Sequence, residues 1–256
     1  MSVFMEGFLA SLFAGIVTGL GGFLIFVRKK YSQGQINFML NLAAGVMLSA
    51  SFFALLVPSM ASVLQFSPRL AVSALWYSLA VFAGVALVWV LNEILPHEHN
   101  NMGHHGMHLS LKKAWLFIIA ITLHKLPEGL AVGVAFGAEN YVNPFSLVIG
   151  IALHNIPEGL TIAISLVAAR VSRIRAALTA LLIGMVQPVG ALLGLLTMHI
   201  SDKIVPLGMA LAGGTLLFVV INEILPETYG YKQTNKSAFA VFSGFIVMTY
   251  LVMILE

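Results

Sequence analysis

The hexapeptide HKLPEG at residues 124–129 recurs thirty residues later as HNIPEG at residues 154–159, each near the middle of an apolar stretch. An ionisable side chain at the centre of a membrane helix costs about 2.5–3.5 kcal/mol on insertion scales and usually marks a pathway. Residues four apart share one helix face, so each copy presents its His and Glu together. The four side chains, His124, Glu128, His154 and Glu158, predict a metal site.

The composition places this repeat in a membrane. Of 256 residues, 59% are apolar and 9% are charged, and the mean hydropathy is +0.97, as in polytopic membrane proteins. Runs of roughly 20 apolar residues cross about 30 Å of hydrocarbon. We therefore predict an all-α polytopic protein in which residues 1–256 form one domain. The eight predicted spanning helices cover residues 3–27, 38–58, 71–95, 114–137, 145–168, 176–199, 204–225 and 237–255.

The basic residues predict the orientation of the chain. Ten of the 13 Lys and Arg residues fall in alternate loops, and only Arg69 and Lys203 fall in the others. The positive-inside rule then puts both termini outside. Short loops favour a multi-pass protein of the bacterial inner membrane, and a homodimer is a further expectation. No basic stripe is interleaved with aromatic residues, so a nucleic-acid partner is not expected.

The doubled hexapeptide predicts an inverted repeat. Consecutive spanning helices run antiparallel, so the two copies cross the bilayer in opposite directions, as in transporters whose substrate sites lie near the midplane. Residues 44–58 also align with residues 212–226 at an offset of 168, which suggests a second, outer inverted repeat. Gly129, Gly133 and Gly137 form a stripe of small residues that would let another helix approach closely.

Lys125 is the remaining charge at membrane depth. It lies roughly 17 Å from either end of its helix, too far for its side chain to reach the interface, so it must point inward and meet an anion. Two carboxylates and one ammonium sum to −1, which favours a single divalent metal ion. The absence of cysteine excludes thiolate ligands.

With its paired His-x-x-Pro-Glu-Gly motifs on the fourth and fifth helices and a His-rich loop before them, the chain resembles the ZIP (Zrt-, Irt-like protein) metal transporters, especially their bacterial GufA-like branch. The resemblance implies uptake of divalent transition metal into the cytoplasm and a 3+2+3 arrangement of helices. It also implies that helices 1, 4, 5 and 6 slide against helices 2, 3, 7 and 8. The ligands would be His124, Glu128, His154 and Glu158, with Met47 as a further ligand.

One departure from the family concerns a second metal ion that often lies beside the first. Lys125 replaces one of its ligands, Asn155 is a neutral form of another, and Gln187 stands where a glutamate is usual. Our hypothesis is that the ammonium of Lys125 substitutes for the second ion.

The loop at residues 96–113 is dense in histidine, which is typical of weak metal capture. A flexible polar linker is the alternative interpretation. The loop residues of interest are His97, His99, His104, His105 and His108.

Two other functional classes are alternatives to a metal transporter. An intramembrane zinc-dependent hydrolase could use His and Glu to activate water, but the His-Glu-x-x-His signature is missing. A metal sensor without flux is the other alternative. No nucleotide-binding loop suggests ATP hydrolysis, so the chain is expected not to be an enzyme and to need no cofactor. Zinc is the favoured substrate, although cadmium, iron and manganese suit the same ligands.

Overall fold

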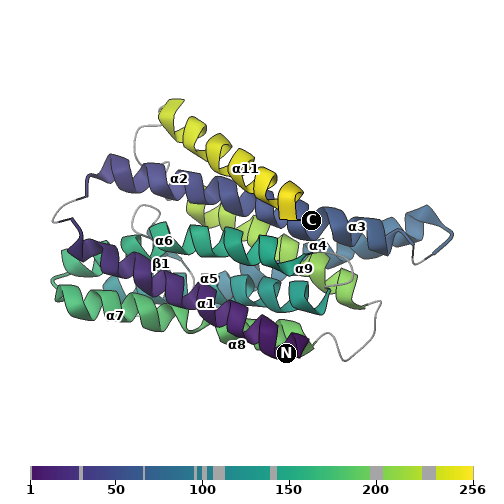
Figure 1. Cartoon of the computed structure of the whole chain (residues 1–256), viewed down its shortest axis with the longest axis horizontal. Coiled ribbons are helices and arrows are strands. Elements are labelled where there is room, and N and C mark those ends of the chain that lie inside the picture. The colour runs from purple at the N-terminus through teal and green to yellow at the C-terminus, as the bar shows by residue number, and fades with distance from the viewer. Residues whose placement is uncertain are drawn as a thin grey trace.

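The computed structural model describes residues 2–28, 31–65, 67–94, 97–99, 103–105, 113–138, 143–196, 204–226 and 235–255. Within these ranges the regular structure is almost entirely helical (Figure 1). The α-helices are α1 (Val3–Phe23), α2 (Gln33–Ser49), α3 (Val57–Val63), α4 (Leu70–Ile94), α5 (Lys113–Gly137), α6 (Pro144–Ala168), α7 (Arg173–Gly184), α8 (Gln187–Leu196), α9 (Ile204–Val219) and α11 (Asn235–Leu255).

Shorter segments join these helices into spanning units. A 3-10 turn, η1 (Leu24–Phe26), extends α1, and a π-helix, η2 (Ala50–Leu56), connects α2 to α3. A second π-helix, η4 (Val220–Ile224), continues α9. Seven units among the described residues are long and apolar enough to cross a membrane, and the 25-residue α5 packs among them as an eighth long helix. The predicted all-α polytopic fold is confirmed.

The second span differs from its prediction, because it runs from residue 33 to residue 63 and not from 38 to 58. Its start is set by a capping box: Ser32 accepts a hydrogen bond from the Gln35 amide, and the Gln35 side chain accepts one from the Ser32 amide. The first turns of α2 are polar, so a search for apolar residues begins too late. The cap is the better guide to the start of this helix.

The sixth span also differs from its prediction of one continuous helix. It breaks after Gly184 into α7 and α8, with a turn at residues 185–186. Pro188 lacks an amide proton and favours the first turn of a new helix, so α8 begins at Gln187. The break brings the Gln187 side chain to the start of a helix in the interior of the protein, where it is fully buried.

Two short strands interrupt the His-rich loop. Strand β1 (His97–His99) pairs antiparallel with β2 (Gly103–His105), and His97 lies opposite His105. Four of the five loop histidines named above belong to this hairpin. The fifth, His108, lies outside the described residues.

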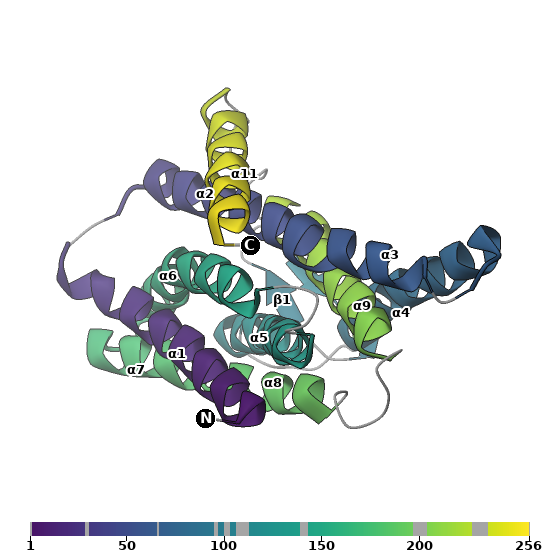
Figure 2. The same ribbon diagram turned by 45° about the vertical axis from the view of Figure 1, so that its right-hand side comes forward.

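Helix packing follows the pseudo-symmetry that the repeats predict. The main pairs are α1 with α6, α5 with α8, α2 with α11, and α4 with α9. The inverted repeat relates the first span to the sixth, the second to the seventh, the third to the eighth and the fourth to the fifth. This exchange turns the α1–α6 pair into the α5–α8 pair, and the α2–α11 pair into the α4–α9 pair. In both views α5 and α6 lie between a layer of α1, α7 and α8 and a layer of α2 and α9 (Figures 1 and 2).

The predicted close approach at glycine is confirmed on α5 and has a counterpart on α6. A Cβ on Gly129 would stand 1.9 Å from the carbonyl oxygen of Gln187, and one on Gly159 would stand 1.9 Å from that of Thr18. The two glycines are thirty residues apart, and each sits one residue after its motif glutamate. These contacts hold α8 and α1 against the backbones that carry the site.

Candidate metal centre

The two hexapeptides form matching turns inside continuous helices. Pro127 lies within α5 and Pro157 within α6, and both helices continue for about three turns beyond them. Each proline removes the amide that would bond to the carbonyl four residues earlier. On α6 the Pro157 carbonyl in turn accepts a hydrogen bond of 2.9 Å from the Thr161 hydroxyl. The glutamates follow directly after the prolines in both helices.

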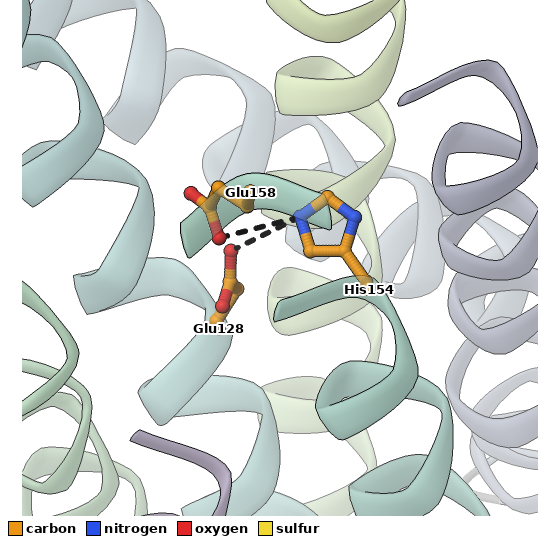
Figure 3. Close-up of side chains that lie close together, drawn as sticks. All are labelled: Glu128, His154 and Glu158. Atoms are coloured by element: carbon orange, nitrogen blue, oxygen red, sulfur yellow. Dashed lines mark ion pairs between the residues drawn. The ribbon is translucent and has the colours of Figure 1, made fainter. Parts of the chain in front are cut away.

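Three of the predicted ligands meet at one point. One ligand atom each from Glu128, His154 and Glu158 lies within 4.8 Å of the other two, and all three residues are buried. His154 Nε2 is 3.7 Å from Glu128 Oε1 and 3.6 Å from Glu158 Oε2. Figure 3 shows the three side chains pointing toward one another from α5 and α6.

These separations suit a shared metal ion better than hydrogen bonds. Bonds of 2.0–2.2 Å to nitrogen and oxygen in a tetrahedral site place two ligand atoms about 3.4 Å apart. The distances of 3.6 and 3.7 Å are close to that value and too long for hydrogen bonds. Glu128 Oε1 is also buried without a hydrogen-bond partner among the described residues. An imidazole and two carboxylates are the donor set that zinc accepts.

The other side of the carboxylates is held by Lys125, whose side chain is completely buried. Its ammonium donates to Glu128 Oε2 at 2.6 Å, to Asn155 Oδ1 at 2.6 Å, and to Glu158 Oε2. The inward orientation predicted for Lys125 is confirmed. One ammonium neutralises only one of two ionised carboxylates, so with both glutamates ionised these three groups sum to −1, which a divalent cation would convert to +1.

Asn155 links this charged cluster to two further helices. Its Nδ2 donates to the Ala14 carbonyl of α1 at 2.7 Å and to Gln187 Oε1 of α8 at 3.0 Å. Because both donations use the amide nitrogen, Asn155 Oδ1 is turned toward the Lys125 ammonium. The four helices α1, α5, α6 and α8 therefore meet around one network. Sequence reasoning did not identify Ala14, because a backbone carbonyl leaves no signal in side-chain identity.

Two other predicted ligands, His124 and Met47, lie outside this group of three. His124 is buried on α5, one turn before Glu128, and is not one of the three clustered ligands. Met47 is 1% exposed and belongs to an apolar cluster that includes Ala44 and Ala50. The structure thus brings together Lys125, Glu128, His154, Asn155, Glu158 and Gln187.

Comparison with known proteins gives one consistent family. A family model described as ZIP zinc transporter matches residues 95–252. The chain is 38% identical over 243 residues to the zinc transporter GufA of Myxococcus xanthus, covering 94% of this chain and 95% of that protein. It is 35% identical to the zinc transporter ZIPB of Bordetella bronchiseptica, with coverages of 91% and 76%. It is 30% identical to the zinc transporter ZupT of Akkermansia muciniphila, with coverages of 94% and 94%.

Proposed function

This chain belongs to the ZIP family of zinc transporters, and on that premise we propose that it moves Zn²⁺ across a membrane through the cluster of Glu128, His154 and Glu158. The observation that supports this most directly is the group of three buried ligand atoms within 4.8 Å of one another. The hydrolase and sensor alternatives are not favoured, because relatives similar over nearly the whole chain are zinc transporters. The metal is therefore a transported substrate and not a cofactor, and the chain is not an enzyme.

We infer that the primary site uses the three clustered ligands, with His124 and Met47 completing the coordination. A transport site must release its ion, so an incomplete or adaptable set of ligands suits it better than a closed structural tetrahedron. A thioether is a soft ligand that would favour Cd²⁺ over harder ions. Met47→Leu should then weaken Cd²⁺ binding more than Zn²⁺ binding, and equal effects on both ions would remove Met47 from the site.

We also infer that Lys125 occupies the place of a second metal ion. Its ammonium contacts both site carboxylates and Asn155, and Asn155 contacts Gln187. Lys125, Asn155 and Gln187 are the three positions that the family resemblance relates to ligands of a second ion. A resident ammonium supplies one positive charge permanently, so a single mobile divalent cation suffices.

The orientation and location are part of the proposal. We place the protein in the bacterial inner membrane with both termini outside. We also propose that transport delivers metal to the cytoplasm. Arg28 and Arg170 lie at the ends of basic loops. The positive-inside rule assigns these loops to the cytoplasmic side. A homodimer is also proposed. No nucleotide-binding loop is present in the sequence, so transport is expected to run without ATP hydrolysis.

A flux assay tests the function. Purified protein in vesicles that contain a zinc-sensitive dye should respond to external Zn²⁺, and His154→Ala and Glu158→Gln should each abolish the response. Glu6→Gln, in the first turn of α1 and outside the ligand cluster, is the matched control and should retain flux. Competition among Zn²⁺, Cd²⁺, Fe²⁺ and Mn²⁺ gives the order of preference. Correctly folded protein that binds zinc but gives no flux would defeat the proposal.

A further inference from the structure

The helices form two groups, and close contacts between backbones hold each group together. We call α1, α5, α6, α7 and α8 the site group, because it carries the ligand cluster, and α2, α3, α4, α9 and α11 the frame group. In the site group, a Cβ on Gly15 would stand 2.3 Å from the Gly184 carbonyl oxygen. In the frame group, a Cβ on Gly84 would stand 2.0 Å from that of Leu211. Helices packed this closely resist rearrangement within their group.

One helix of the frame group, α11, also reaches the site group. Its main partner is α2, and the hydroxyls of Ser49 and Thr249 lie 2.9 Å apart where these two helices meet. Beyond this point α11 packs against α6, and in both views its C-terminal end lies beside that helix (Figures 1 and 2). The α11 helix is therefore anchored in the frame group and touches the site group with its last turns.

A hydrogen bond joins the end of α11 to the start of α6. The Asn143 Nδ2 donates to the Leu255 carbonyl oxygen at 2.7 Å. Leu255 is the last residue of α11, where carbonyl groups have no partner within the helix. The other polar atom of the Asn143 side chain, Oδ1, caps α6 by accepting from the Phe145 amide at 3.0 Å. Aspartate or serine caps a helix equally well, so only the bond to α11 needs the donor nitrogen of an asparagine.

Two turns further along α6, a side chain of α11 fills a notch. Met248 is fully buried, and a Cβ on Gly150 would stand 2.7 Å from its sulfur atom. Gly150 follows Asn143 by seven residues and Leu255 follows Met248 by seven, so both contacts lie on one face of each helix. Gly150 also lies one turn before the ligand His154. We call these four residues, Asn143, Gly150, Met248 and Leu255, the α6–α11 clasp.

The clasp differs from the glycine contacts within each group, because side chains make it. A side-chain amide and a flexible thioether meet the facing helix, whereas backbone meets backbone at Gly15 and at Gly84. A transported ion must reach a buried site from each side of the membrane in turn, and transporters with inverted repeats achieve this by moving one bundle against the other. The clasp lies between the two groups, so such a motion changes the position of α6 on α11.

We propose that the α6–α11 clasp stabilises the docked conformation, in which the start of α6 rests on the end of α11, and that the clasp opens when the site turns to the other side of the membrane. This inference rests on the proposed transport function. The clasp acts without touching the metal ion, because none of its four residues belongs to the ligand cluster. It sets the balance between two conformations, and with it the rate at which the site changes sides.

Substitutions that keep the helix cap but remove the donor test the clasp. Asn143→Ser retains a capping oxygen and is too short to reach Leu255. The ratio of the docked conformation to all others should fall by about 2- to 12-fold, as expected when one hydrogen bond is lost from one conformation only. Asn143→Asp should lower the ratio further, because its carboxylate faces the carbonyl end of α11. The matched control is Ser2→Ala, which removes the cap of α1 and should leave the ratio unchanged.

Double electron–electron resonance between two spin labels measures this ratio without any transport, and the chain has no native cysteine to interfere. Gly34→Cys places one label on the frame group, where no atom lies within 4 Å of a Cβ. Ile174→Cys places the other label at an exposed position of the site group. The population of label pairs at the separation found in this structure gives the docked conformation.

Cross-linking supplies the second arm. Oxidation of the double variant Gly150→Cys with Met248→Cys should fix α6 to α11 and lower zinc flux at least ~10-fold, because the change of conformation is then blocked, and reduction should restore flux. The matched control is Ser49→Cys with Thr249→Cys. It replaces two hydroxyls that lie 2.9 Å apart within the frame group, so its disulfide should leave flux unchanged.

The outcomes separate the clasp from the function. An unchanged conformational ratio in Asn143→Ser, or full flux in the oxidised pair at Gly150 and Met248, would overturn the clasp while leaving transport intact. If that pair does not oxidise, the spin-label populations decide the question alone. Absence of flux in the unmodified protein would defeat the proposed function, and the populations would still show whether the clasp holds α6 on α11.

Discussion

Replacing Lys125 with methionine should turn a one-metal site into a site that needs more metal to stay folded. The substitution keeps most of the stem of the side chain and removes the ammonium, which contacts Glu128, Glu158 and Asn155. Two buried carboxylates then face each other without their counter-ion. Removing one partner of a buried ion pair typically destabilises a protein by about 3–5 kcal/mol. For a chain of this size, this corresponds to a fall in melting temperature of roughly 6–20 °C.

Zinc should reverse much of this loss. An ion that binds only the folded state stabilises it by about 2.7 kcal/mol at a hundred times its dissociation constant. Lys125→Met should therefore melt early in a chelator and recover in excess Zn²⁺. Metal counting on purified protein should rise from about one tightly bound ion to about two, if the second ion takes the place of the ammonium.

The controls for this experiment are available in the same chain. Lys236→Met removes an exposed lysine at the start of α11 and should leave both the melting temperature and the metal count unchanged. The reasoning about Lys125 fails if the unmodified protein already holds two tightly bound zinc ions. It also fails if Lys125→Met melts at the unmodified temperature in chelator.

Three further predictions concern packing, ligands and the hairpin. Gly159→Ala should destabilise the protein by about 1–3 kcal/mol, as overpacking does, because the new Cβ would stand 1.9 Å from the Thr18 carbonyl oxygen. Gly34→Ala has open space around it, and thermal unfolding should show no loss for this control. Glu128→Gln should weaken zinc binding by at least ~100-fold in isothermal titration, since a ligand carboxylate is lost; a change under threefold would remove it from the site. Deleting residues 97–105 should change the zinc concentration needed for half-maximal flux more than the maximal flux itself, and loss of all flux would assign the hairpin to the path.

Several features could be read from the sequence alone. Hydropathy located the spanning segments, because the lipid solvent demands long apolar runs. The doubled hexapeptide predicted matching His-Glu faces on antiparallel helices, and the structure brings Glu128, His154 and Glu158 together. Lys125 had to point inward on grounds of length and charge, and it does. Each of these inferences depends on local spacing and on the cost of exposing charge to lipid.

Other features depend on contacts between segments far apart in the chain. The Asn155 amide is oriented by the carbonyl of Ala14, 141 residues away, and by the side chain of Gln187. The Ala14 carbonyl leaves no signal in the sequence, and Gln187 was singled out only through the resemblance to the family. The sequence prediction also missed the break before α8, which delivers Gln187 to the site. Residues 176–199 are apolar enough to be predicted as one continuous helix.

The sequence by itself therefore determined that this chain crosses a membrane, that it contains an inverted repeat, and which charged side chains its interior must accommodate. Only the tertiary structure decided which side chains share one point and which oxygen atoms face the Lys125 ammonium. The physical reason is that helix formation and membrane insertion depend on residues close in sequence, whereas the coordination geometry depends on packing between helices.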